Sequence, residues 1–283
     1  MIKKIFFIFV LISSASKPFA QSKVFYSQNF SQNTRIPSIN TIAISSLSAT
    51  TAVAGGTIIS DGGSSIISKG VCWGTSLNPT INLSTKTDEG IGISDFSSNI
   101  TGLSTGTTYH VRAYATNSIG TSYGQDIQFV PPLVVGSSYL GGTIISVSTG
   151  ADGIQHGVII SPELGPAIWG NATLVNWLYG VGKDNTARLY TIQSSLGSNV
   201  AVNKLYNNYY SLNDWYIPSQ SEIMANANNL VSIGLPGGSY ITSNEISNTN
   251  AAIFVMYNGQ IYQPQIFSYN KTWTFNLRAF RNF

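Results

Sequence analysis

The sequence predicts two folded parts, an all-β sandwich followed by an α+β module, and two observations carry this prediction. Between residues 39 and 130, short apolar runs alternate with Gly, Ser and Asn turns at nearly regular spacing, as in a β-sandwich. From residue 136 onward, strand patterns are mixed with helical patterns and a helix-capping motif. The length of 283 residues also fits about two domains.

The first 20 residues have the pattern of a secretory signal peptide. Two lysines precede the apolar run Ile5–Ile12, and small residues then lead to a cleavage position after Ser16 or Ala20. A transmembrane helix needs about 20 apolar residues, far more than this run contains. We therefore expect an exported protein, secreted or at the cell surface, without a transmembrane segment in its mature chain. Residues 21–38 are polar and aperiodic, which indicates a leader.

Charged side chains are scarce, at 9% of residues, against about 25% in a typical soluble protein. Three lysines precede residue 21, so the remaining chain carries eleven basic and eleven acidic residues. Nucleic-acid binding depends on neutralising phosphates with Lys and Arg. The composition therefore argues against a nucleic-acid partner and fits an extracellular surface lined by hydroxyl and amide groups.

In the first part, four segments are expected to form β-strands. They are Thr50–Ile59, Gly70–Trp73, Phe96–Ile100 and Thr108–Thr116. Tyr109 follows a tight turn at the start of the last segment, which is the setting of a tyrosine corner. Alternation places His110 on the outer face of this strand, where we expect it to be solvated. Cys72 is the only cysteine, so no internal disulfide or thiolate metal site forms, and we expect a small buried side chain.

Several short motifs of this first part are specific. They are Lys69–Gly74, Asn78–Thr80, Ile100–Leu103, Tyr109–Asn117 and Gly120–Gly124. With these motifs, residues 39–130 resemble the fibronectin type III-like repeats of bacterial secreted proteins. The resemblance implies an immunoglobulin/fibronectin III-like sandwich that acts as a spacer, since a fold of this kind does not by itself imply a function.

Residues 131–135 are expected to be a linker, in which Pro131 and Pro132 favour an extended, semi-rigid joint. For residues 136–283 we expect two helices packed on a small, mostly antiparallel sheet. The expected helices are Ser198–Tyr209 and one that begins after Ser219, and the expected strands are Ser138–Val147, His156–Ile160, Tyr240–Glu245, Ala251–Tyr257, Gln260–Phe267 and Thr272–Phe280. The Asn258–Gly259 pair predicts a type I′ hairpin turn between two of these strands.

The stretch Asn213–Ile223 is expected to be the fixed corner of the second module. Ser219 and Glu222 have the spacing of a capping box, in which each side chain accepts a backbone N–H at the start of a helix. Gly234 and Pro236 then mark the end of the helical pattern. Capping therefore accounts for Ser219 and Glu222 without a ligand.

The landmarks of this module extend over nearly its whole length. They are Tyr139–Gly142, His156–Ile159, Trp169–Gly170, Gly180–Thr186, Asp214–Glu222, Thr242–Glu245, Gly259 and Leu277–Arg281. With them, residues 136–283 resemble the C-terminal domain of the Legionella collagen-like adhesin and the related Fibrobacter-type major paralogous domains. The resemblance implies a C-type-lectin-like fold that adheres to a glycan or glycosaminoglycan. The module's six basic and six acidic residues do not supply the basic surface that a sulfated polymer needs.

The residues of catalytic and metal sites are poorly represented. His156, with Asp152 four residues before it, is the only histidine of the second module, and a hydrolase would also need a nucleophile beside it. A glycosidase needs two converging carboxylates, which no spacing indicates. Asn244, Glu245 and Asn248 leave a weak calcium site open. We therefore expect no enzymatic activity, no cofactor and no metal.

The candidate ligand-binding residues are the aromatic and amide side chains of the corner and the closing strands. They are Tyr257, Tyr262, Tyr269, Asn270, Trp273, Trp215 and Tyr216. Rigid aromatic rings and adaptable amides are the groups that binding surfaces favour, and aromatic rings stack on sugar faces. The alternative interpretation places the tryptophans in the core.

We therefore expect a secreted or surface-exposed, non-catalytic adhesion protein that contacts an extracellular glycan or a surface protein. The alternative is a structural building block of the cell surface or matrix that self-associates into a homo-oligomer and has no small ligand.

Overall fold

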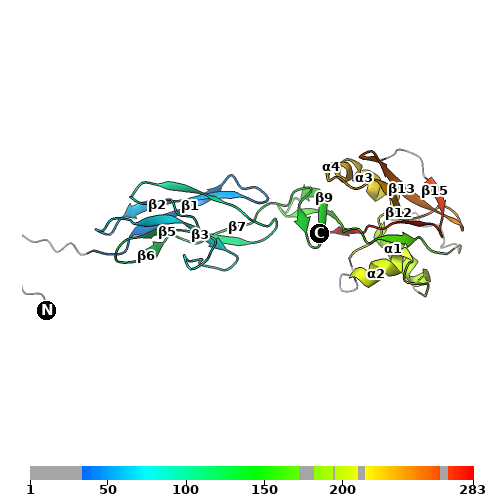
Figure 1. Cartoon of the computed structure of the whole chain (residues 1–283), viewed down its shortest axis with the longest axis horizontal. Helices are drawn as coiled ribbons and strands as arrows, with labels where there is room; N and C mark the ends of the chain where they lie inside the picture. Colours follow the sequence, from blue (N-terminus) through cyan, green and yellow to red (C-terminus); the bar gives the residue numbers. More distant parts are fainter. Residues whose placement is uncertain (1–33, 172–181, 194, 210–213, 262–266) are drawn as a thin grey trace, which may run out of the picture. The chain divides into compact units, whose positions relative to one another are not determined.

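The structure is a computed structural model that describes residues 34–171, 182–193, 195–209, 214–261 and 267–283 (Figure 1). The expected signal peptide and Tyr262 lie outside the described residues. Among the residues described, no helix has the length and apolar character needed to cross a membrane. Within the range expected to be a leader, Arg35 N donates to Gly62 O at 2.8 Å, and the first strand begins at Ser38.

Residues 38–129 form two antiparallel sheets that enclose one core, as in an immunoglobulin/fibronectin III-like β-sandwich. The first sheet has the order β1-β2-β4, with β1 at Ser38–Ser45, β2 at Ala52–Ser60 and β4 at Phe96–Ile100. The second contains β3 at Ser68–Gly74, β5 at Tyr109–Thr116, β6 at Thr121–Tyr123 and β7 at Ile127–Phe129, with β6 and β7 both paired to β5. The four predicted strands are therefore confirmed.

The tyrosine corner is also confirmed. Tyr109 Oη accepts a hydrogen bond from Ser104 N at 3.1 Å, which ties the start of β5 to the turn before it. Below it, Val111 and Ile100 are completely buried in the core between the sheets. Cys72 is fully buried as expected.

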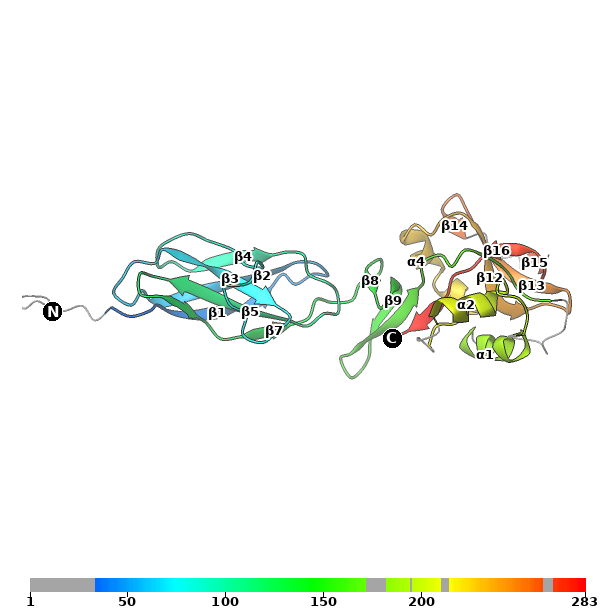
Figure 2. The same ribbon diagram turned by 60° about the horizontal axis from the view of Figure 1, so that its bottom comes forward.

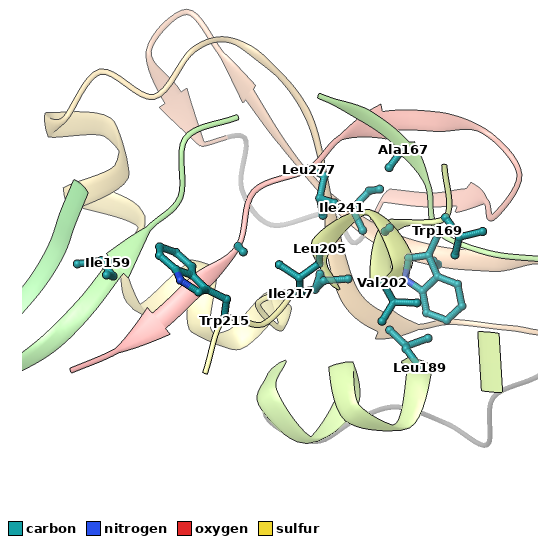
Figure 3. Packing of buried hydrophobic residues seen from close by; sticks show 14 of the residues in the cluster. Ile159, Ala167, Trp169, Leu189, Val202, Leu205, Trp215, Ile217, Ile241 and Leu277 are labelled. Carbon is teal, nitrogen blue, oxygen red and sulfur yellow. The ribbon is translucent and has the colours of Figure 1, made fainter. Parts of the chain in front are cut away.

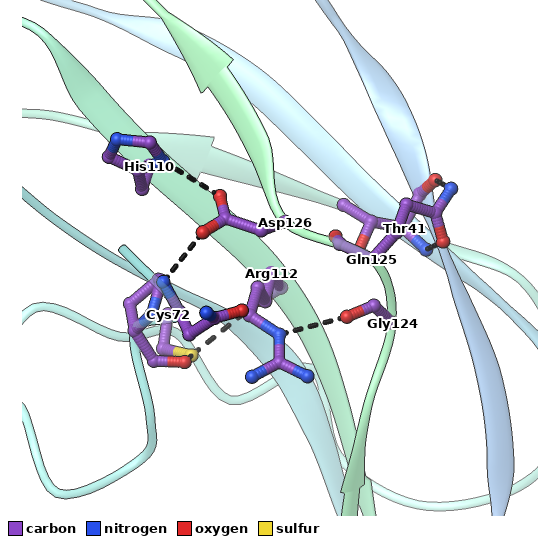
Figure 4. A network of polar contacts seen from close by, with 9 residues as sticks. Thr41, Cys72, His110, Arg112, Gly124, Gln125 and Asp126 are labelled. Carbon is purple, nitrogen blue, oxygen red and sulfur yellow. Dashed lines mark hydrogen bonds and ion pairs between the residues drawn. The ribbon is translucent and has the colours of Figure 1, made fainter. Parts of the chain in front are cut away.

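Three residues between β6 and β7, Gly124–Asp126, make contacts outside the regular pairing with β5 (Figure 4). Gly124 O accepts from Arg112 Nε at 2.8 Å. The side-chain amide of Gln125 accepts from Thr41 N at 3.2 Å and donates to Thr41 O at 2.9 Å. Because Thr41 belongs to β1, this amide substitutes for a strand residue and joins the two sheets.

His110 is buried, so the prediction of a solvated histidine was wrong. Its Nδ1 lies 2.9 Å from Asp126 Oδ1, while Asp126 Oδ2 accepts from Asn78 N at 2.6 Å. On the same face, Tyr114 Oη donates to Thr87 O at 2.6 Å. The segment between β3 and β4 therefore covers the outer face of β5, which strand alternation alone does not reveal.

The second module, from Leu133 to Phe283, contains two sheets. One has the order β17-β10-β9-β8, with β8 at Ser138–Tyr139, β9 at Gly142–Thr149, β10 at Gln155–Ile160 and β17 at Phe280–Asn282. The other has the order β11-β16-β12-β13, with β11 at Pro166–Ile168, β16 at Thr274–Asn276, β12 at Gly238–Glu245 and β13 at Asn250–Tyr257. β14 at Gln260–Ile261 and β15 at Phe267–Asn270 both pair with β13.

Helices lie on both faces of the sheet that contains β12 and β13 (Figures 1 and 2). The helices are α1 at Gly182–Gln193, α2 at Ala201–Tyr209, α3 at Gln220–Ala225 and α4 at Ala227–Ser232. Ile241 packs with the core on the α1 and α2 side, shown in Figure 3, and its neighbour Tyr240 packs with Ile223 and Leu230 on the other side. The apolar residues on both faces of β13 are explained by this arrangement.

Some predicted elements differ from the observed ones. The expected strand Ser138–Val147 is a hairpin, since Leu140 and Gly141 turn with positive φ of 47° and 86°. The helix α1 was not predicted, because it buries Asn185, Thr186 and Gln193 on one face instead of an apolar stripe. Leu133, which we expected in the linker, is buried in the core of the second module.

The corner before α3 joins the closing strand of the module. Tyr216 and Phe280 exchange backbone hydrogen bonds of 2.8 Å in both directions. The capping box is confirmed, and Glu222 Oε2 also accepts from Gly182 N at 2.9 Å. This carboxylate therefore caps α3 and holds the first residue of α1.

Candidate functional site

The structure separates the candidate residues of the corner from those of the closing strands. Trp215 is 5% exposed and Tyr216 is 3% exposed, and both belong to the hydrophobic core. Figure 3 shows the Trp215 ring in the buried cluster. Burial raises the pKa of the Tyr216 phenol strongly, with the nearby Glu222 carboxylate as a second cause. Because their rings are buried, these two residues stabilise the fold and cannot reach a ligand.

Tyr257 is 62% exposed but belongs to a different part of the surface. In the β13–β15 ladder, Tyr269 lies opposite Ala251, six residues before Tyr257. At about 3.3 Å per residue, that separation is about 20 Å along the strand. Tyr257 instead precedes the hairpin turn at Asn258 and Gly259, whose φ values of 49° and 71° confirm the predicted turn.

Four aromatic side chains from β15, β16 and the turn between them form one cluster, which we call the aromatic platform: Phe267, Tyr269, Trp273 and Phe275. Tyr269 is the centre, with ring centroids 6.1 Å from Phe267, 5.7 Å from Trp273 and 5.5 Å from Phe275. Phe275 also packs against the buried core. Trp273 is 56% exposed. The platform thus extends from the core to a tryptophan in solvent.

The turn that carries Trp273 has a defined shape. Asn270 Oδ1 accepts from both Thr272 N at 3.0 Å and Thr272 Oγ1 at 2.7 Å, and Trp273 N donates to Asn270 O at 3.0 Å. These are the bonds of an Asx turn inside a tight turn. Asn270 lies opposite Asn250, on the other face of the ladder from Tyr269. Its side chain therefore shapes the turn that presents the platform.

A buried ion pair fixes this turn to the module. The ammonium of Lys271 contacts the carboxylate of Glu245, and both side chains are inaccessible to solvent. The same ammonium lies 4.7 Å from the ring centroid of Trp169, whose Nε1 donates to Thr242 O at 2.9 Å. Lys271 N donates in addition to Thr249 O at 2.9 Å. Lys271, which lies between Tyr269 and Trp273 in the sequence, is thus held through both its ammonium and its backbone N–H.

One feature of the sequence is consistent with this ion pair. Lys271 is the only charged residue between Ile246 and Leu277. A lone lysine in such a long uncharged stretch is a candidate for burial with a partner, because isolated charges are seldom buried. Glu245, just before that stretch, is the partner.

Asn244 and Glu245, two of the residues considered for a weak calcium site, have partners within the protein. Glu245 is committed to Lys271, and Asn244 Oδ1 accepts from Gln220 N at 2.6 Å at the start of α3. Two of the three residues considered for a weak calcium site therefore hold the protein together. Among the described residues, no three His, Cys, Asp or Glu side chains converge as a metal site would require.

The other pair considered for chemistry lies in solvent. His156 Nε2 is 3.6 Å from Asp152 Oδ2, and half of each side chain is exposed. The carboxylate of Asp152 accepts from Ile154 N at 2.9 Å, and this bond is the main cause of a lowered pKa for that group. The pair sits at the turn between β9 and β10, which this Asp side chain shapes.

No protein-family model matches this chain, and no curated protein matches it. Solved structures with some likeness include a myokine, with 18% identity, 35% of this chain and 99% of that chain covered, and a TM-score of 0.26. Domains of titin show 18% identity over 35% of this chain and 32% of that chain, with a TM-score of 0.25. The sensor domain of an anti-sigma factor from Pseudobacteroides cellulosolvens shows 20% identity over 34% of this chain and 76% of that chain, with a TM-score of 0.25.

Proposed function

We propose that the chain is a secreted or cell-surface, non-catalytic adhesion protein, in which the sandwich is a spacer and the second module binds a glycan. In this proposal the second module is a C-type-lectin-like domain, and the aromatic platform is its contact surface. The proposal rests on one observation above all: Trp273 is held in solvent by a turn that a buried ion pair fixes.

Holding a tryptophan rigid with more than half of its surface in water costs free energy that burial of the ring would recover. Large aromatic rings are among the side chains that contribute most when they are buried. A flexible loop tip could fold its tryptophan back onto the protein. Here the hydrogen bonds of Asn270 and the burial of Lys271 fix the turn instead. A preorganised ring loses little conformational freedom when it binds, which favours affinity.

The groups around the ring suit a sugar. Thr272 and Thr274 flank Trp273 and are exposed. A pyranose ring has a face of C–H groups and a rim of hydroxyl groups, so it can stack on an indole while its rim meets hydroxyl side chains. Covering on the order of 100 Å² of apolar surface in such a stack would contribute about 2–3 kcal/mol.

The direct test is a glycan screen with the mature chain and three variants. Trp273→Ala and Tyr269→Ala are expected to weaken binding to whichever glycan is retained by roughly ten-fold or more, as for central aromatic contacts of other interfaces. Tyr257→Ala is the matched control, because it removes an equally exposed aromatic ring about 20 Å away along β13.

Circular dichroism must show that the variants are folded. If Tyr257→Ala weakens glycan binding as much as Trp273→Ala does, the platform is not the binding site. A chain that retains no glycan and forms oligomers by light scattering would instead support the self-associating structural role.

A further inference from the structure

We infer that the ligand of the aromatic platform is an uncharged, repetitive polysaccharide of hexopyranose units, bound through one or two sugar rings per copy of the protein. This inference rests on the proposed function and names the class of glycan.

The first argument is electrostatic. Between Ile246 and Leu277, which include β13, β14, β15, the turn and β16, Lys271 is the only charged residue. Its ammonium is buried against the Glu245 carboxylate, so the pair adds no net charge to the surface. Recognition of sulfate, phosphate or carboxylate groups in proteins depends on Arg and Lys side chains that can donate to them. The described residues of the platform offer none.

The second argument is the shape of the platform. The rings of Tyr269 and Trp273 are tilted by 53° with centroids 5.7 Å apart, so they do not form one long plane. Phe267, Tyr269 and Phe275 are each partly buried, whereas Trp273 is exposed. The accessible aromatic surface is therefore mainly the Trp273 ring. Such a surface has room for one or two sugar rings.

The third argument concerns affinity. One stacked ring and a few hydroxyl contacts correspond to a dissociation constant in the millimolar range or weaker, because association must first offset lost translational and rotational freedom. A contact this weak becomes effective when several copies of the protein on one surface meet many copies of the same unit along one polymer, because each bound copy raises the effective concentration for the next. The structure therefore fits a repetitive polymer better than a free sugar.

The test is affinity electrophoresis of the mature chain in native gels that contain a soluble unsubstituted β-glucan, heparin or polygalacturonate. We expect retardation by the β-glucan, unchanged between low salt and about 0.5 M salt, because screening weakens only ionic contacts. Trp273→Ala is expected to abolish retardation, Trp273→Phe to keep part of it, and Tyr257→Ala to leave it within about two-fold of the parent. Free glucose should compete only at about tens of millimolar, because a single ring binds no more tightly than the millimolar range.

Retardation by heparin or polygalacturonate that depends on Trp273 and falls with salt would overturn the uncharged ligand and leave the proposed glycan-binding function standing. Competition by free glucose at low millimolar concentration would overturn the polymer requirement alone. Absence of retardation by all three polymers, together with a negative glycan screen, would overturn the proposed function itself.

Discussion

At the scale of single residues, Lys271 is the side chain on which the candidate site depends most. It lies between Tyr269 and Trp273 in the sequence, and its ammonium contacts Glu245 and the ring of Trp169. A buried ion pair gains little net stability over apolar residues of the same shape, but removing one partner leaves an uncompensated charge in the core. The pair therefore acts mainly by fixing where the turn lies.

We expect Lys271→Met to lower the free energy of unfolding of the second module by about 3–5 kcal/mol, because the Glu245 carboxylate is left buried and alone. Glu245→Gln should have a similar effect from the other side. The double variant Lys271→Met with Glu245→Leu should recover much of the loss. Urea unfolding measures all three, and additive losses in the double variant would contradict the assignment.

Glu163→Gln is the matched control, because it removes one partner of an ion pair that is partly exposed. Glu163 lies 3.8 Å from Arg278 in a partly exposed pair, which typically contributes less than about 1 kcal/mol. A loss as large as that of Lys271→Met would show that burial is not the deciding factor.

Cys72 provides a prediction on pH. Burial raises the pKa of its thiol to about 11, from an ordinary value of 9.0. The raised value means that the folded state favours the neutral thiol. Its contribution to stability is present below about pH 9 and is lost as pH rises toward 11, because the unfolded chain then releases a proton that the folded chain retains.

The measurement is the reaction of Cys72 with a thiol reagent. At pH 8 we expect the folded chain to react far more slowly than the urea-unfolded chain, since the thiolate is the reactive form and the side chain is inaccessible. Equal rates in the two states would contradict both the burial and the raised pKa.

At the scale of elements, the corner between α1 and α3 is the most constrained part of the second module. Glu222 Oε2 accepts from Ser219 N at 2.7 Å and from Gly182 N at 2.9 Å. Thr186 Oγ1 accepts from Ile217 N at 2.9 Å and donates to Gly182 O at 2.7 Å. The first turn of α1 is thus bonded directly to the strand-like segment that leads into α3.

Gly182→Ala is expected to destabilise the module by about 1–3 kcal/mol, as overpacking does elsewhere. A Cβ at this position would lie 2.5 Å from Glu222 Oε2 and 2.6 Å from Ile217 O. The matched control is Gly197→Ala, whose Cβ would meet only Asn199 Oδ1, at 3.3 Å. Thermal unfolding should separate the two variants, and equal melting temperatures would contradict the close packing at Gly182.

Elements with local signals could be predicted from the sequence, and elements with tertiary causes could not. The spacing of Ser219 and Glu222 predicts the start of a helix, and the pair Asn258–Gly259 predicts a hairpin turn. By contrast, α1 faces the core with Asn185, which donates to Ser243 Oγ at 3.1 Å. A helix that buries amides against partners from a distant strand has no apolar period to detect.

The candidate site shows the same division. Aromatic content at Tyr269 and Trp273 was visible in the sequence, but their proximity depends on the β13–β15 register and on the turn between β15 and β16. The same register places Tyr257 away from Tyr269 and Trp273. Trp215 could not be told from a surface tryptophan, because its burial requires the packing of the strand segments shown in Figure 3.

At the scale of the whole chain, no residue of the sandwich core belongs to the clusters of the second module. The sandwich cluster comprises residues between Ile39 and Phe129, and the other two clusters comprise residues between Leu133 and Phe283. Stability arises within each cluster, since the apolar surface buried there is what drives folding. The two parts should therefore respond separately to changes in their own cores.

Ile100→Ala tests this separation from the sandwich side. Ile100 is completely buried between the sheets, so its truncation should lower the unfolding free energy of the sandwich by about 2–5 kcal/mol. Ile241→Ala, in the core beneath the platform, should do the same in the second module. Calorimetry of the full mature chain should show two transitions, with each variant lowering only one of them.

Polysaccharide retardation provides the second readout: Ile100→Ala should retain it at temperatures where the second module is folded. A single transition lowered by both variants would show that the chain unfolds as one unit, and loss of retardation in folded Ile100→Ala would show that the sandwich contributes to binding beyond a spacer.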